Sequence, residues 1–116
     1  MFIDTRAIGF PLTDAIRRAA ESRTRSALAP VRRWITAVTV RLHDVNAGRG
    51  GVDKRCRIVV ALRRCGAVVA EATKVDLYTA IDSATGRLRR AARESVRRII
   101  GRDRKDRQRP GALLSV

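Results

Sequence analysis

Two alternating stretches on either side of a glycine-rich segment constrain the fold of this chain more than any other feature. In residues 34–45, Val38, Val40 and Leu42 alternate with Thr, Arg and His, and residues 54–64 repeat this pattern. A period of two places the apolar side chains on one face of a β-strand and the polar ones on the other. The glycines between the stretches favour a turn, so the two strands are predicted to form an antiparallel hairpin.

Two shorter segments add strands to this hairpin. Residues 2–8 (FIDTRAI) predict a first strand, and residues 67–73 (AVVAEAT) predict a fourth strand after a short turn at residues 65–66. The first two strands are separated by a helical segment, and we therefore expect them to be parallel with a right-handed crossover. The third and fourth strands are expected to be antiparallel neighbours.

Two amphipathic helices complete the predicted order β-α-β-β-β-α, an α+β fold. The first helix follows a good N-cap, Thr13, and is expected to end before Pro30, because the residue preceding a proline disfavours helical angles. The second helix starts behind Asp76 and has apolar residues at spacings of three, four and seven. It is expected to run to about Ile100, because Gly101 is suited to a helix stop.

The length of 116 residues suits one domain. We expect residues 1–101 to form this domain and residues 102–116, which are charged and then contain Pro110–Gly111, to form a flexible basic tail.

Both helices are expected to cover the same face of the four-stranded sheet, because its Val, Ile and Leu residues must be buried. The opposite face would then carry a row of polar side chains: Arg41, His43, Arg55, Arg57 and Arg63. Such charges cannot lie unpaired in a core. This face is therefore expected to meet water or a polyanion.

The charge balance indicates the kind of partner. The net charge is +15, and 23 of the 26 basic residues are arginine. Arginine presents a planar fork of donors that binds phosphate in bidentate fashion. Nucleic acid is the leading expected partner and an anionic membrane the second. A GC-rich codon bias could explain the choice of arginine over lysine, but it does not explain the excess of positive charge.

Several classes of function have no support in the sequence. One His and two Cys fall short of a zinc site, and Cys56 is expected to be a small core residue. No P-loop, Ser/His/Asp arrangement or clustered acid pair indicates an enzyme or a cofactor site. No apolar run is long enough to cross a membrane, and the N-terminus does not resemble a signal peptide, so a cytoplasmic protein is expected.

Three motifs together resemble the hibernation-promoting factor and ribosome-associated inhibitor family of bacterial ribosome-binding proteins. They are LTDAI (Leu12–Ile16), DVNAGRGGVDKRCRI (Asp44–Ile58) and VDLYTAIDSATGRL (Val75–Leu88). They occur in the expected order on the expected elements, and the resemblance covers roughly residues 2–100.

The resemblance implies the β-α-β-β-β-α fold and binding to the small ribosomal subunit, with 16S rRNA and neighbouring ribosomal proteins as partners. The family occupies the channel for messenger and transfer RNA, which blocks initiation and keeps idle ribosomes intact under stress. Long members carry a further domain that pairs two ribosomes, for which this chain has no room. We expect a monomer away from the ribosome.

Two groups of residues are candidates for binding RNA. The sheet group lies on the strands and the glycine-rich segment: Arg41, His43, Arg49, Lys54, Arg55 and Arg57. The helix group lies on the two helices: Arg17, Arg18, Arg87, Arg90, Arg93, Arg97 and Arg98. Between residues 87 and 98 only Glu94 offers local charge compensation, which favours RNA contact over a merely solvated face.

Other residues have simpler interpretations. Gly48, Gly50 and Gly51 serve either turn geometry or close approach of the backbone to RNA, and the sequence leaves both open. Asp44 and Asp53 are expected to pair with neighbouring arginines and hold the loop. The aromatic residues Trp34 and Tyr78 are expected in the core or at its edge rather than as platforms for stacked bases.

Two rival functions remain from the sequence. A general RNA-binding or RNA-chaperone module would bind duplexes, single strands and ribosomes alike. Membrane attachment through the second helix would need a free apolar face. We expect Leu88, Ala91 and Ile99 to be used in covering the sheet, so binding to membranes is disfavoured.

Overall fold

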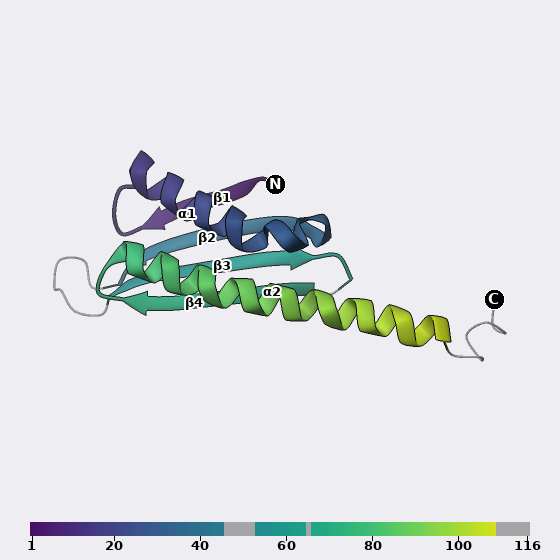
Figure 1. The fold of residues 1–116 in the computed structure, drawn as a ribbon. Coiled ribbons are helices and arrows are strands. Elements are labelled where there is room, and N and C mark those ends of the chain that lie inside the picture. Colours follow the sequence, from purple (N-terminus) through teal and green to yellow (C-terminus); the bar gives the residue numbers. More distant parts are fainter. Residues whose placement is uncertain (46–52, 65, 109–116) are drawn as a thin grey trace.

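The computed structural model describes residues 1–45, 53–64 and 66–108 (Figure 1). The element order is the predicted β-α-β-β-β-α, with one additional short helix after the first long one. The elements are β1 (Ile3–Ile8), α1 (Asp14–Leu28), the 3-10 helix η1 (Ala29–Trp34), β2 (Ile35–Asp44), β3 (Lys54–Leu62), β4 (Gly66–Lys74) and α2 (Leu77–Gln108).

The four strands form one sheet in the order β1-β2-β3-β4. Strands β1 and β2 are parallel, whereas β2–β3 and β3–β4 are antiparallel, as the sequence predicts. The register places Arg41 of β2 between Arg6 of β1 and Arg57 of β3, and places His43 beside Arg55. Residues that share a face in this register lie close together, so the pairing decides which charges are neighbours.

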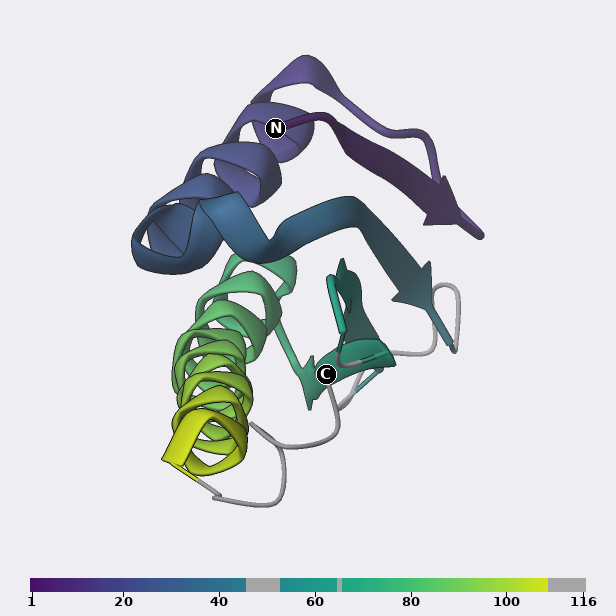
Figure 2. The same ribbon diagram turned by 90° about the vertical axis from the view of Figure 1, so that its right-hand side faces the viewer.

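Both helices cover one face of the sheet, as Figure 2 shows from the end of the strands. The core forms between them and the alternate residues of the strands. The largest fully buried apolar side chains are Leu28 of α1, Leu42 of β2, Ile58 of β3, and Ile81 and Leu88 of α2. The alternation in the sequence therefore indicated the buried faces of β2 and β3 correctly, because successive side chains of a strand must point to opposite sides.

The boundaries of α1 follow the local signals. The Thr13 side chain accepts a hydrogen bond from the Ile16 amide at 3.2 Å, which caps the first turn. The helix ends at Leu28, before Pro30, but the chain then continues as the unpredicted helix η1. A proline is compatible with the first turn of a new helix because its missing amide hydrogen would have no partner there. Helix η1 buries Val31 and leads directly into β2.

The predicted end of the second helix is wrong. Helix α2 does not stop at Ile100 but continues through Gly101 to Gln108, so residues 102–108 of the predicted tail are helical. Gly101 does not adopt the left-handed conformation that ends many helices. A glycine inside a helix costs only about 1 kcal/mol relative to alanine, and the arginines and lysine that follow are good helix formers. Residues 109–116, the rest of that tail, lie outside the described residues.

The core ends before the helix does. Ile99 is 2% exposed and Val96 is 6% exposed, whereas the described side chains after Ile99 are at least partly exposed. Removing the residues after Arg102 is therefore expected to leave the midpoint of thermal unfolding within a few degrees of the full chain. Circular dichroism at 222 nm measures this, and a large fall in the midpoint would show that the end of α2 supports the domain.

Cys56 is a core residue, as predicted. It is fully buried on the helix side of β3, and burial raises the pKa of its thiol to about 12. A neutral thiol in this position acts as a small apolar side chain. Cys65 lies outside the described residues.

Candidate nucleic-acid interface

The open face of the sheet carries the arginines that the alternation predicts. Arg41 on β2 and Arg55 and Arg57 on β3 alternate with buried neighbours, and His43 lies beside them. The structure adds two acidic residues to this face, Asp4 from β1 and Glu71 from β4, together with Arg6. The face is therefore a mixed charged surface rather than a uniformly basic one.

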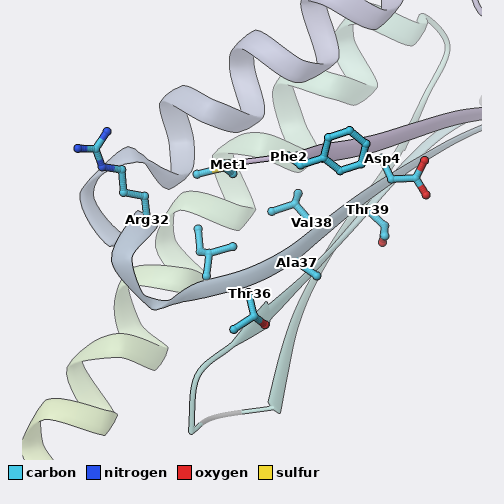
Figure 3. A pocket seen from close by; sticks show the side chains of 9 residues that line it. Met1, Phe2, Asp4, Arg32, Thr36, Ala37, Val38 and Thr39 are labelled. Atoms are coloured by element: carbon cyan, nitrogen blue, oxygen red, sulfur yellow. The ribbon is translucent and has the colours of Figure 1, made fainter.

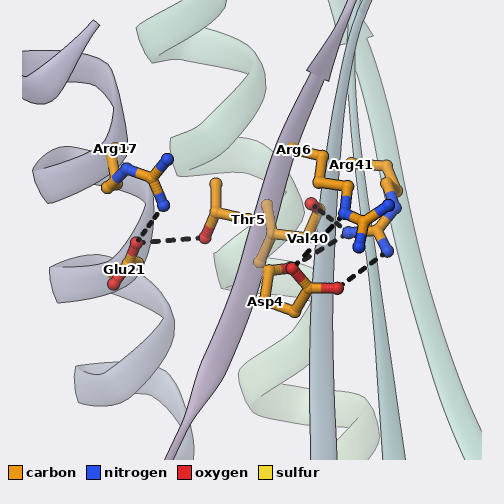
Figure 4. Close-up of polar contacts among 7 residues, drawn as sticks. All are labelled: Asp4, Thr5, Arg6, Arg17, Glu21, Val40 and Arg41. Carbon is orange, nitrogen blue, oxygen red and sulfur yellow. Dashed lines mark hydrogen bonds and ion pairs between the residues drawn. The ribbon is translucent and has the colours of Figure 1, made fainter. Parts of the chain in front are cut away.

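Ion pairs compensate about half of this charge, because the two carboxylates are shared among Arg6, Arg41, Arg55 and Arg57. An Arg41 Nη atom lies 3.1 Å from Asp4 Oδ2, and its other Nη atom donates to the Asp4 backbone oxygen at 3.0 Å (Figure 4). Arg55 and Arg57 both lie beside Glu71, with N–O distances of 3.5 Å and 3.3 Å. Pairs of this kind join β1 to β2 and β3 to β4, and they lower the charge that the face can offer to a polyanion.

Because of the Asp4–Arg41 pair, the free energy of unfolding is expected to change with pH in the acidic range. The hydrogen bond from Arg41, opposed by partial desolvation and helped by the charge of Arg6, lowers the pKa of Asp4 below its usual 3.8. The ionised carboxylate thus stabilises the fold above about pH 4, and this stabilisation is lost as pH falls through the lowered pKa. In Asp4→Asn, the free energy of unfolding, measured by urea titration, should fall less steeply below about pH 4 than it does in the unmodified protein. Parallel curves for the two proteins would contradict this role.

Lys54 occupies a different environment from the rest of the sheet group. Its ammonium lies 2.8 Å from Asp53 Oδ1 and 3.2 Å from Asp44 Oδ1, at the base of the glycine-rich segment. The hydrogen bond to Asp53 raises the pKa of Lys54 despite desolvation, and Asp44 adds to this effect. Asp44 and Asp53 flank the loop as predicted, but among the described residues their partner is this lysine rather than an arginine. A backbone hydrogen bond of 2.9 Å from the Val45 amide to the Asp53 oxygen closes the same base.

Most of the glycine-rich segment, residues 46–52, lies outside the described residues. Arg49 of the sheet group, and Gly48, Gly50 and Gly51, lie outside the described residues. Their predicted contacts with RNA stay predictions.

The outer face of α2 has the strongest uncompensated charge in the described part of the chain. Between residues 87 and 98 it carries six arginines and one acidic residue, Glu94, which pairs with Arg98 at 2.8 Å. Within the described residues, no side-chain hydrogen bond or ion pair involves Arg90, Arg93 or Arg97. These three line, with Arg89 and Glu94, a shallow hollow of about 440 Å³. The buried stripe of α2 points to the sheet, which leaves this row to solvent.

The contribution of α1 is smaller. Arg17 lies 3.8 Å from Glu21, whose carboxylate also accepts a hydrogen bond from the Thr5 hydroxyl on β1 (Figure 4). Arg18 is exposed and, in the ranges that the structure describes, has no ion pair. Arg18 is therefore more available to contact RNA than Arg17, the other α1 residue of the helix group.

Arg87 was assigned to the helix group, but the structure gives it a local role. Its Nη1 donates to the backbone oxygen of Glu71 at 2.6 Å, reaching from α2 to strand β4 at the border of the sheet. A covered carbonyl on an edge strand is less available for pairing with another chain. This contact occupies part of the guanidinium that the sequence assigns to RNA.

Two residues of interest were not predicted from the sequence. Arg23 of α1 reaches α2, where its Nε lies 2.9 Å from Asp82 Oδ1 and its guanidinium lies 5.9 Å from the centre of the Tyr78 ring. Tyr78 is 41% exposed, so its predicted place in or beside the core is wrong, whereas Trp34 packs against the core as expected. Arg89 is the second of these residues, and it lines the hollow beside Arg90, Arg93 and Arg97 on α2. The crowding of arginines on the helix was the available signal for Arg89, but no local signal distinguishes Arg23.

A second hollow near the N-terminus is lined mainly by apolar and threonine side chains. It has a volume of about 350 Å³ and lies between the N-terminus, η1 and the start of β2, and Figure 3 shows its side chains. Phe2 is 84% exposed at its border. Asp4 and Arg32 are the charged residues of its lining, and the others are apolar or threonine. A single arginine beside a carboxylate does not form a row of cations that could bind a polyanion.

The described residues contain no group of three or more His, Cys, Asp and Glu that could hold a metal ion. In the same ranges, no helix is long and apolar enough to cross a membrane.

Comparisons with known proteins agree with the predicted resemblance. The family model described as Sigma 54 modulation protein / S30EA ribosomal protein matches residues 3–100. A ribosomal subunit interface protein from Coxiella burnetii superposes with a TM-score of 0.68 at 21% identity, covering 83% of this chain and 99% of that one. The N-terminal domain of Protein Y from Thermus thermophilus superposes with a TM-score of 0.62 at 28% identity, covering 81% and 96%. No curated protein sequence matches the chain.

Proposed function

The chain belongs to the Sigma 54 modulation protein / S30EA ribosomal protein family, and from this premise we propose that it is a ribosome hibernation factor. It binds the small ribosomal subunit through ribosomal RNA and occupies the channel for messenger and transfer RNA. Translation is inhibited because the channel is filled, so no bond is made or broken. Binding to ribosomes implies a cytoplasmic location.

The observation that carries this proposal is the row of arginines on α2 that have no ion pair with any described residue. Arg90, Arg93 and Arg97 recur at spacings of three and four, which places them along one face of a helix. RNA duplexes are recognised mainly through their shape, phosphates and 2′-hydroxyls, and arginine forms bidentate contacts with phosphate. A straight row of guanidinium groups on a helix of 32 residues, about 48 Å long, suits a structured phosphate surface.

The sheet group takes a secondary part in this proposal. Arg41, Arg55 and Arg57 are held by Asp4 and Glu71, so RNA must compete with existing ion pairs for them. His43 lies beside Arg55 on the same face, and Arg49, which is outside the described residues, stays a predicted contact. We assign the helices the main contribution to affinity and the sheet a contribution to orientation.

Binding to purified small subunits tests the proposal against a general RNA-binding module. We expect the protein to co-sediment with small subunits on sucrose gradients and to be displaced by transfer RNA. A duplex RNA of similar length should bind much more weakly at the same salt concentration. Equal affinity for duplexes, single strands and subunits, with no competition by transfer RNA, would favour the general module instead.

A further inference from the structure

A polar hollow of about 200 Å³ lies between the two long helices and shares Arg89 with the hollow beside Arg90, Arg93 and Arg97. It is several times larger than the volume of one water molecule, about 30 Å³. Two residues of α1 and four of α2 line it: Arg23, Ser26, Asp82, Thr85, Gly86 and Arg89.

Arg23 is positioned at this hollow by two contacts with α2. Its Nε is paired with Asp82 Oδ1 at 2.9 Å, and its guanidinium lies 5.9 Å from the centre of the Tyr78 ring. Its Nη1 atom is buried, yet it has no hydrogen-bond partner among the described residues. A buried donor of this kind is costly unless a partner accepts its hydrogens. The Arg23 side chain as a whole is 40% exposed, so part of it is open to an acceptor in the hollow while Asp82 holds Nε.

Gly86 is the second unusual feature of the hollow. It lies in the middle of α2, where glycine is less favourable than alanine. A Cβ atom placed there would meet no other atom within 4 Å, so neither packing nor a left-handed conformation requires glycine. What the missing side chain does provide is room in the hollow beside the helix backbone.

The charges favour an anion. Arg23 and Arg89 bring two positive charges, against the single carboxylate of Asp82, which is engaged with Arg23 Nε. The Ser26 hydroxyl adds a donor, whereas the Thr85 hydroxyl is bonded to the Ile81 and Asp82 backbone oxygens at 2.8 Å and 3.1 Å. Arginine is the side chain best suited to bind a tetrahedral oxyanion with more than one hydrogen bond.

We propose that this hollow is a discrete binding pocket for one phosphate group, held between Arg23 and Arg89 with Gly86 leaving room for it. In the RNA-binding role this group is a backbone phosphate of ribosomal RNA, and this identification rests on the proposed function. The same chemistry would accept a free phosphate compound. The pocket itself does not depend on the ribosome and can be tested without it.

Titration of the ¹⁵N-labelled protein with inorganic phosphate tests the pocket directly. Chemical-shift changes should concentrate on Gly86 and its neighbours and on the Arg23 side chain, and sodium chloride of the same ionic strength should not reproduce them. Gly86→Met fills the hollow with a good helix former and should abolish this response. Gly101→Met is the matched control, because Gly101 is the other glycine of α2 and also has open space around its Cβ position. Arg89→Gln provides a second variant that removes charge from an exposed position.

The outcomes separate the pocket from its ligand. Shifts spread evenly over all basic residues, or an unchanged response in Gly86→Met, would overturn the pocket. If the response is localised and Gly86→Met also weakens binding to small subunits by about tenfold, the ligand is a phosphate of ribosomal RNA. If the response is localised but binding to subunits is unchanged, the pocket takes a free phosphate compound. A protein that binds no subunits but retains the localised response would refute only the proposed function.

Discussion

Replacing Arg90, Arg93 and Arg97 together with glutamate is expected to weaken binding to isolated small ribosomal subunits by at least about a hundredfold at physiological salt. Each of these side chains is exposed and, within the described part of the chain, unpaired, so each is free to contact phosphate. Contacts between arginine and phosphate release counterions. The slope of log affinity against log salt concentration should therefore become shallower by about two to three.

The fold should survive this change. Arginine and glutamate have similar helix propensities, and all three positions face away from the core. Unfolding in urea, followed by circular dichroism, should give a midpoint close to that of the unmodified protein. This separates loss of binding from loss of structure.

A variant with the same change in net charge provides the control. Arg25, Arg32 and Arg33 are also exposed, but they lie on α1 and η1 and belong to neither candidate group. Their joint replacement with glutamate changes the total charge equally and should weaken binding much less. Equal losses for the two triple variants would mean that net charge, rather than the face of α2, governs binding.

Replacing Leu88 with alanine is expected to lower the free energy of unfolding by about 2–5 kcal/mol. Leu88 is fully buried in the middle of α2, where it belongs to the core between the helices and the sheet. Removing it loses apolar contact and leaves a cavity, and a domain of this size has only about 5–15 kcal/mol of stability. Urea titration measures the change.

Ile100→Ala is the control for this substitution. Ile100 lies on the same helix but is 37% exposed, so its truncation should cost about 1 kcal/mol or less. Binding to subunits should fall in Leu88→Ala only as far as the folded fraction falls. A loss of affinity in protein that remains fully folded would mean that Leu88 also sets the position of the arginine row.

Local patterns predicted most of the architecture. The alternation of Val38, Val40 and Leu42 set the buried face of β2, and the signals at Thr13 and Pro30 set the limits of α1. The predicted helix boundaries were wrong where one residue suggested a helix end but its neighbours in the sequence favour a helix. Gly101 predicts a helix stop, but the good helix formers around it allow α2 to continue. Pro30 predicts the end of α1, but it also lies in the first turn of η1.

The candidate site was predicted unevenly for a related reason. The arginines of α2 were found because they crowd into one short segment with a single nearby acid, Glu94. The compensation of Arg41 by Asp4 was not predicted, because the two residues are 37 positions apart. The same holds for Glu71, which lies 14 positions after Arg57 and neutralises the middle of the sheet face. The orientation of Arg23 by Asp82 and Tyr78 likewise joins two different helices.

The sequence by itself determined the order of the elements, the faces they bury and the large excess of positive charge. These follow from the periods of strand and helix, which are properties of the backbone and act over a few residues. Only the tertiary structure decided which positive charges stay free and where a guanidinium meets a hollow. Coulomb interactions depend on distance in space, and the sheet register and helix packing set that distance for residues far apart in the chain.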